Sequence, residues 1–311
     1  MAEVKIDTLN RAAKECPRDM IAEAEAAYHD RVAEIADKVV ESAELRIILL
    51  AGPSGSGKTT SANLIADAVR ERGEECLVVS LDDFYRDSTD PDYPRQPDGD
   101  RDFECPESLH LEEIATLLGD MAEGREFNLP KYDFKVGRRV EISRHEPMPD
   151  GCLIIEGLHA LNPAISACLN PSHLLKVFVS VSTNINRNGE RILSGRKLRF
   201  VRRMVRDSLY RGADAMRTLS MWHDVLDAED VYLYPYKPTA DVAFDTFHAF
   251  EPGVMRDYAL PLLTEEIASL DPYARTVRDA LLLAESIDSA LVPENSLIRE
   301  FIPGGIYEDL Y

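Results

Sequence analysis

The chain has 311 residues, of which 45% are hydrophobic and 29% charged, and its formal net charge at pH 7 is −21. This balance is typical of a globular protein, and the length allows one large domain or two small ones. The negative charge argues against general binding to nucleic acid or to an anionic membrane, and the lack of any run of about 18 apolar residues argues against a membrane-spanning helix.

Segments with helical periodicity alternate along the chain with short, unbroken apolar runs. Apolar residues at steps of three and four predict helices, and the unbroken runs predict strands buried on both faces of a parallel sheet. In chain order we expect a helix at 17–43, a strand at 46–51, a helix at 58–72, a strand at 76–81, a helix at 107–123, strands at 153–155, 174–181 and 241–244, and helices at 257–269 and 272–291. This alternation predicts a three-layer α/β fold with a mainly parallel sheet.

Three other segments depart from the alternation. Residues 86–106 are rich in Asp, Pro and Arg and predict a long loop, a kind of loop that is usually functional or disordered. Residues 127–143 form short alternating segments around Gly137, which predicts a β-hairpin. Residues 184–217 are basic, and we expect them to be helical. The first helix is expected to pack on the core, and binding to a partner is the alternative for it.

A glycine-rich segment follows the first predicted strand. It fits the pattern G-x-x-x-x-G-K-[ST] and lies between a buried strand and a helix, so its backbone N–H groups and the helix dipole should hold phosphate oxygens. Lys58 should reach the β- and γ-phosphates of a nucleoside triphosphate, and the Thr59 hydroxyl should bind Mg²⁺. A turn that binds nothing is the alternative. The predicted nucleotide-binding residues of this loop are Gly52, Pro53, Ser54, Gly55, Ser56, Gly57, Lys58, Thr59 and Thr60.

Acidic residues come directly after two of the predicted strands. Asp82 and Asp83 follow the strand at 76–81, and Glu156 follows the strand at 153–155. Ligands of open α/β sheets lie outside the carboxyl ends of the strands, so these carboxylates should lie beside the phosphates. There they could bind Mg²⁺ or accept the proton of an attacking hydroxyl. The alternative is that they only cap helices or turns.

A basic patch stands out in this acidic chain. Residues 187–217 hold ten basic residues and three acidic ones, a local charge of +7. The basic residues are Arg187, Arg191, Arg196, Lys197, Arg199, Arg202, Arg203, Arg206, Arg211 and Arg217, and the acidic ones are Glu190, Asp207 and Asp214. We expect an Arg-rich helical lid that closes on a triphosphate, with pairing to the protein's own acids as the alternative.

The cysteines and the N-terminal residues bear on localisation. The five cysteines are Cys16, Cys76, Cys105, Cys152 and Cys168. Their odd number and the lack of CxxC spacing argue against a zinc site or a disulfide framework, so we expect free thiols. The first residues do not resemble a secretory or transit signal, which favours a cytoplasmic protein.

Several segments together resemble the uridine kinase and phosphoribulokinase family of P-loop kinases, in the family's order over about residues 46–250. The segments are GPSGSGKTT, SLDDFYR, FECPESL, PKYDF, IIEGLHAL and RRMVRDSLYRG. The likeness is greatest to uridine-cytidine kinases and bacterial uridine kinase-like proteins. It implies a nucleoside kinase that uses ATP and Mg²⁺, acts on a small molecule and forms dimers or tetramers. We also expect an N-terminal helical extension at 1–44, a P-loop kinase domain at 45–250 and, at 251–311, a C-terminal helical segment packed on the kinase domain, which the family's motifs do not explain.

The resemblance assigns roles to individual residues. Asp82 matches the catalytic Asp that activates the nucleoside 5′-hydroxyl. Asp82, Thr59 and Glu156 match the residues associated with the magnesium ion. The matches in the nucleoside pocket are Tyr85, which lines it, Glu104, in place of the Asp that binds ribose hydroxyls, and Tyr132, which packs against the base. The matches in the lid are Arg203 and Arg206, which contact substrate and triphosphate, and Arg211.

Two positions depart from the uridine-cytidine kinase pattern. Gly137 stands where those kinases carry a His that contacts the pyrimidine, and Ala213 replaces the last Arg of a lid sequence RGR. The base preference is therefore open. Two alternatives to a nucleoside kinase remain: a kinase of the same family that acts on a sugar phosphate or another small alcohol, and a regulatory switch that hydrolyses ATP.

Overall fold

A five-stranded, all-parallel sheet forms the centre of the molecule. The computed structural model describes residues 2–42, 44–96, 99–133, 136–148, 151–167 and 169–310. The strands are β2 (Ile47–Ala51), β3 (Cys76–Ser80), β6 (Cys152–Glu156), β7 (Leu174–Ser180) and β10 (Val242–Asp245). Their order across the sheet is β10-β7-β2-β6-β3, and every pair is parallel. The five predicted strands and the α/β fold class are therefore confirmed.

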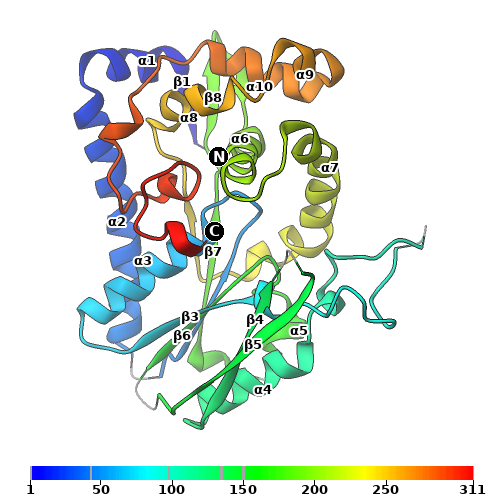
Figure 1. The fold of residues 1–311 in the computed structure, drawn as a ribbon. Helices are drawn as coiled ribbons and strands as arrows, with labels where there is room; N and C mark the ends of the chain where they lie inside the picture. Colours follow the sequence, from blue (N-terminus) through cyan, green and yellow to red (C-terminus); the bar gives the residue numbers. More distant parts are fainter. Residues whose placement is uncertain are drawn as a thin grey trace.

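Helices cover both faces of this sheet (Figure 1). Side chains of one strand point alternately to the two faces: Ile48 and Leu50 of β2 join a core cluster with α2 (Pro17–Val40) and α3 (Lys58–Glu71), whereas Ile47 and Leu49 join a second cluster with α4 (Leu111–Ala122). A strand buried on both faces has no polar face, which explains its unbroken apolar sequence. The result is the expected three-layer arrangement.

The C-terminal half contains more and shorter helices than predicted. They are α5 (Pro163–Ser166), α6 (Gly195–Tyr210), α7 (Ala215–Tyr232), α8 (Glu251–Ala259), α9 (Glu265–Leu270) and α10 (Pro272–Leu282). The prediction of one helix at 257–269 was wrong, because α8 begins at Glu251 and Pro261 interrupts the segment. The helix predicted at 272–291 ends at Leu282, and the Asp288 side chain accepts the Ala290 N–H to start a separate 3₁₀ turn.

The helical prediction for 184–193 was also wrong. These residues form the antiparallel strands β8 (Asn184–Arg187) and β9 (Glu190–Leu193), and β1 (Glu3–Lys5) pairs parallel to β8. The turn residues Asn188 and Gly189 have φ of 52° and 84°, as a two-residue hairpin requires. The Asn-Gly pair was the sequence signal for this hairpin. Helix α1 (Ile6–Glu15), which was not predicted, joins β1 to α2.

The predicted hairpin is present as β4 (Phe127–Asp133) and β5 (Arg138–His145). Gly137 between them has φ of 68°, and its carbonyl accepts a 2.7 Å hydrogen bond from the Ser88 N–H. A Cβ on Gly137 would lie 2.5 Å from Ser88 Oγ. A His at this position would have a strained backbone and would collide with Ser88. The conformation of this turn therefore favours Gly over the His of uridine-cytidine kinases.

The remaining sequence expectations concern thiols and membranes. Cys16, Cys76, Cys105 and Cys152 are free, and Cys168 lies outside the described residues, as does Phe134 of the PKYDF segment. Within the described part of the chain, no helix combines the length and apolar character needed to span a membrane.

Candidate active site

The glycine-rich loop connects the central strand β2 to α3, as predicted. It runs from Gly52 to Gly57, and α3 begins at Lys58. The Lys58 amine lies 3.4 Å from the Pro53 carbonyl oxygen, so the lysine folds back over the loop. The loop therefore leads into the N-terminal end of a 14-residue helix, where the helix dipole favours an anion, while the Ser54 N–H of the loop donates to Glu229 at 2.8 Å.

The carboxyl ends of three neighbouring strands bring the predicted acids to this region. Glu156, the last residue of β6, lies in register between Leu50 of β2 and Ser80 of β3. Its carboxylate accepts a 3.2 Å hydrogen bond from the Thr59 hydroxyl. Asp82 follows β3 by two residues, and its N–H donates to the Ser80 hydroxyl. The loop, Glu156 and Asp82 thus meet at the edge that the sequence indicated.

Glu156 is the most perturbed acid of the site. Its side chain is buried, and burial raises its pKa to about 7 against the opposing effect of Lys58. The charges of Asp82 and Glu300 raise the pKa further. These couplings place a lysine and three carboxylates within electrostatic range of one another.

The two neighbouring aspartates differ in their contacts. Asp82 is exposed, whereas Asp83 is partly buried and accepts hydrogen bonds from the Tyr132 N–H at 3.1 Å and the Lys131 amine at 3.3 Å. Burial raises the pKa of Asp83, and these two contacts oppose the rise. Asp83 therefore holds the β4–β5 hairpin, whereas the Asp82 carboxylate forms no ion pair with the part of the chain that the structure describes.

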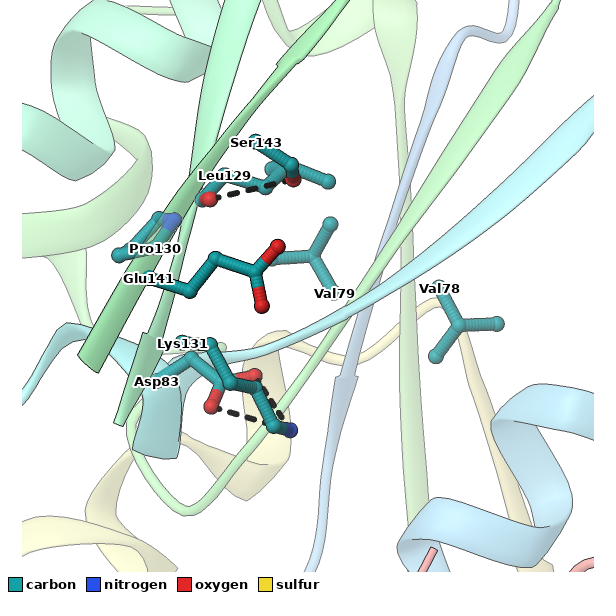
Figure 2. A pocket seen from close by; sticks show the side chains of 8 residues that line it. All are labelled: Val78, Val79, Asp83, Leu129, Pro130, Lys131, Glu141 and Ser143. Atoms are coloured by element: carbon teal, nitrogen blue, oxygen red, sulfur yellow. Dashed lines mark hydrogen bonds and ion pairs between the residues drawn. The ribbon is translucent and has the colours of Figure 1, made fainter. Parts of the chain in front are cut away.

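A cavity of about 230 Å³ lies between the hairpin and the edge strand β3. Figure 2 shows Asp83 and Lys131 paired at one side of it, with Glu141 and Ser143 from β5 above. Asp83 is its one lining residue among the acids that the sequence placed at the strand ends.

The predicted acceptor residues also come together. The rings of Tyr85 and Tyr132 lie 6.0 Å apart between centroids. Burial raises the pKa of Tyr85 well above its usual value, and the charges of Asp82 and Glu104 add to the rise. Burial raises the pKa of Glu104, Arg203 lowers it and Asp82 raises it again. Asp82 therefore borders a group of two tyrosines, a carboxylate and an arginine.

Two arginines of α6 are tied to the protein's own acids, which was the alternative reading of the basic patch. Arg199 pairs with Glu229 of α7, and Arg202 pairs with Glu251 of α8; all four side chains are buried. The guanidinium of Arg199 also donates to the Ser54 carbonyl, and that of Arg202 to the Gly55 carbonyl. These two arginines therefore fix the phosphate-binding loop to α6.

The three predicted lid arginines surround one carboxylate. Asp207 lies 3.3 Å from the Arg203 Nε, 2.9 Å from an Arg206 nitrogen and 3.8 Å from an Arg211 nitrogen. The charge of Arg206, followed by burial, lowers the pKa of Arg211 to about 10. Burial lowers the pKa of Arg203 as well. Glu300 lies 3.7 Å from Arg206 as well, so three arginines and two carboxylates leave one excess positive charge, which suits a phosphate.

Arg203 also reaches the loop, because its guanidinium donates a 2.8 Å hydrogen bond to the Ser54 hydroxyl. The structure thus brings the phosphate-binding loop, Glu156 and Asp82 to one end of the sheet, with Arg203 reaching the loop. His159, which lies in the IIEGLHAL segment and was given no role, is next to the acceptor group. The structure also adds three acids outside the quoted segments: Glu229, Glu251 and Glu300. Their partners lie up to 240 residues away in sequence, so composition and spacing carried no signal for them.

The chain has recognisable relatives. The profile of the family described as "Phosphoribulokinase / Uridine kinase family" matches residues 47–250. "Uridine kinase-like protein 5" of Arabidopsis thaliana is 26% identical over 224 residues, which cover 71% of this chain and 42% of that protein. A uridine kinase of Schizosaccharomyces pombe is 28% identical over 187 residues, 58% of this chain and 36% of that protein. The chain therefore spans less than half the length of either relative.

A third relative is closer in length. A uridine kinase of Lactobacillus helveticus is 26% identical over 226 residues, which cover 72% of this chain and 94% of that protein. Among solved structures, one titled as a possible uridine kinase from Bacillus stearothermophilus superposes with a TM-score of 0.48 at 18% identity, over 70% of this chain and all of that one. Since the family profile matches more than half of the 311 residues, the chain belongs to the phosphoribulokinase and uridine kinase family.

Proposed function

We propose that this protein transfers the γ-phosphoryl group of ATP to a hydroxyl of a small molecule, and that the acceptor is the 5′-hydroxyl of a nucleoside. The observation that carries the proposal is the meeting of the phosphate-binding loop with Glu156 and Asp82 at adjacent strand ends. A hydrolysing switch would need the loop and a metal site, but it would not need Asp82 to face a group of tyrosines and Glu104. The names of the three relatives above support a nucleoside acceptor.

In this proposal the loop N–H groups and Lys58 hold the β- and γ-phosphates. The oxygens of Thr59, Glu156 and Asp82 suit Mg²⁺, which prefers oxygen ligands and keeps several waters. No group of three metal-ligating side chains is assembled among the described residues, which suits an ion held largely by phosphate and water. Mg²⁺ would neutralise charge on the phosphate oxygens.

Asp82 is the proposed base. It is exposed and pairs with no basic side chain among the described residues, whereas the neighbouring Asp83 is held by the hairpin. Asp82 would accept the proton of the acceptor hydroxyl while that oxygen bonds to the γ-phosphorus and the bond to the β-phosphate oxygen breaks, releasing ADP. Arg203, Arg206 and Arg211 would stabilise the negative charge of the transferring group.

The charges beside the proposed acceptor site favour an uncharged acceptor over a sugar phosphate. Glu104 and Asp82 are both acidic, and several cations of the hairpin and of the loop after Tyr85 pair with other acids. Lys131 pairs with Asp83, and Arg86 pairs with Asp90. A phosphorylated acceptor would meet the two carboxylates of Asp82 and Glu104, whereas ribose hydroxyls can donate hydrogen bonds to them.

A phosphoryl-transfer screen with ATP and Mg²⁺ tests the proposal. The acceptors are a panel of nucleosides and a panel of sugar phosphates, and the readout is the mass of the product. We expect a nucleoside monophosphate that disappears in the Asp82→Asn variant. Products from sugar phosphates alone would overturn the nucleoside acceptor, and ATP turnover that needs no acceptor would favour a hydrolysing switch.

A further inference from the structure

The last turns of the chain cover the phosphate-binding loop. We call residues 294–308 the C-terminal cap. Four of its apolar side chains are fully buried: Leu297, Ile298, Phe301 and Ile302. In Figure 1 the cap is the red segment between α2 and α6, beside the beginning of α3. It belongs to the same core cluster as α2 and α3, so it is a packed part of the fold.

The apolar part of the cap contacts the loop and its supporting helix. Leu297 packs directly on Gly57, since a Cβ built on that glycine would lie 2.6 Å from the leucine Cδ1. The ring of Phe301 lies under the guanidinium of Arg202, 5.1 Å from the ring centroid. Leu297 therefore lies against the beginning of α3, and Phe301 lies against α6.

Glu300 makes the polar contact. Its side chain is 4% exposed, and its carboxylate accepts a 2.9 Å hydrogen bond from the Thr60 hydroxyl. The same oxygen lies 3.5 Å from the Thr60 backbone nitrogen. The other oxygen lies 3.7 Å from Arg206. Glu300 thus joins the first turn of α3 to one of the proposed lid arginines.

These partners are the ones that a phosphate would take. The backbone N–H groups in the first turn of the helix after such a loop bind the phosphates nearest the nucleoside, and the helix dipole favours an anion there. A lid arginine completes the contacts of a bound triphosphate. Glu300 offers one negatively charged carboxylate to both donors, so it is an internal substitute for a phosphate group.

We propose that the C-terminal cap is an autoinhibitory contact: Glu300 holds the α3 end of the nucleotide site, and triphosphate binding must displace its carboxylate. This inference rests on the proposed nucleotide site. Two anions a few ångströms apart in a buried site repel each other strongly, so Glu300 and a phosphate cannot share Thr60 and Arg206. The carboxylate therefore lowers nucleotide affinity until the cap moves.

Contacts outside the site define how the cap is attached. Tyr307 donates to Asp67 of α3, and Glu308 accepts a hydrogen bond from Tyr210 of α6. The guanidinium of Arg299 donates to carbonyl oxygens of the chain at Ser289 and Val292. These contacts do not involve the loop, so Glu308 provides a matched control: an acid of the same cap that leaves the nucleotide site untouched.

The test measures binding of ATP and of ADP to the full chain, with Mg²⁺ and without an acceptor, by isothermal titration calorimetry. Glu300→Gln removes the charge and keeps an oxygen acceptor for the Thr60 hydroxyl. We expect its Kd for ATP to fall roughly 10-fold or more relative to the unchanged protein, with Glu300→Ala changing in the same direction. Glu308→Gln should leave the Kd unchanged.

Hydrogen exchange of the unchanged protein provides a second readout. Adding ATP should slow exchange of the amides at 52–60 and speed exchange of those at 296–302, because the cap is displaced. A Kd that rises or stays constant in Glu300→Gln, or a cap that becomes more protected with ATP, would overturn the inference and make Glu300 a positioning residue for Arg206. If neither the unchanged protein nor Glu300→Gln binds ATP, the proposed nucleotide site is wrong, and this inference is wrong with it.

Discussion

The hydroxyl of Thr59 donates a hydrogen bond to the carboxylate of Glu156 across 3.2 Å. This contact joins the first turn of α3 to the end of β6, two elements separated by almost 100 residues of sequence. Parallel pairing explains it, because β2 and β6 are neighbours and both end at the same edge of the sheet. Both oxygen groups would serve as ligands of the proposed magnesium ion.

Glu156→Gln should weaken the use of Mg²⁺. The change keeps the size of the side chain and removes the negative charge beside Thr59, so the Mg²⁺ concentration for half-maximal activity should rise about 10-fold or more. Titrating Mg²⁺ at saturating ATP measures this. Glu71→Gln at the exposed end of α3 is the control, and an unchanged Mg²⁺ requirement in Glu156→Gln would remove Glu156 from the metal site.

Asp82→Asn should reduce turnover while ATP binding remains. Loss of a general base typically lowers kcat by about 10²–10⁴-fold, whereas Asp82 donates nothing to the loop that holds the phosphates. Steady-state kinetics and ATP binding measured side by side test this. Asp83→Asn is the matched control. Its kcat should stay within roughly 10-fold of that of the unchanged protein, because an amide oxygen can still accept the Tyr132 N–H. Equal losses in the two variants would contradict the distinction between the aspartates.

Arg202→Met should destabilise the protein strongly. It leaves the Glu251 carboxylate buried without its cation, a change that typically costs about 3–5 kcal/mol of unfolding free energy. Urea unfolding followed by circular dichroism measures it. The control is Arg196→Met on the same helix, whose partner Asp230 is exposed, and there the loss should stay below about 1 kcal/mol. Similar losses at both positions would show that the Arg202–Glu251 pair does not support the loop.

Glu25→Gln should change how stability depends on pH. Glu25 is a buried residue of α2, and burial raises its pKa from 4.5 to about 7. The folded state therefore binds the proton more tightly than the unfolded state. Stability from this group is complete below about pH 4.5 and is lost as the pH rises through 7. The facing nitrogens of His29 and His248 lie 3.8 and 3.9 Å away, and burial lowers the pKa of both rings, so they stay largely uncharged at neutral pH.

Urea unfolding at pH 5 and pH 8 tests this expectation. Because Gln carries no charge, the free energy of unfolding of the variant relative to the unchanged protein should rise between the two pH values, by about 2–3 kcal/mol. Glu23→Gln, an exposed position on the same helix, should show no such change. A difference that is constant with pH would mean that Glu25 is already charged at pH 5 in the folded state.

The strands and the phosphate-binding loop could be predicted because their causes are local. A strand buried on both faces must be apolar throughout, as Ile47–Ala51 is, and a loop that wraps phosphate needs glycines followed by a helix. Asp82 and Glu156 followed from position alone, since the ends of parallel strands meet at one edge. The hairpin at Asn188-Gly189 was also local, and its turn signal outweighs the helical pattern of the basic residues around it.

The amino-acid sequence by itself determined the layers, the family and the identity of the groups that meet at the sheet edge. Only the tertiary structure decided which arginines can contact a ligand. Arg199 and Arg202 cannot, because they form buried ion pairs with Glu229 and Glu251 of other helices. It also decided that Glu300 reaches Thr60 from the far end of the chain. The physical reason is that a charge's role depends on the partners within a few ångströms of it, and packing rather than spacing along the chain selects those partners.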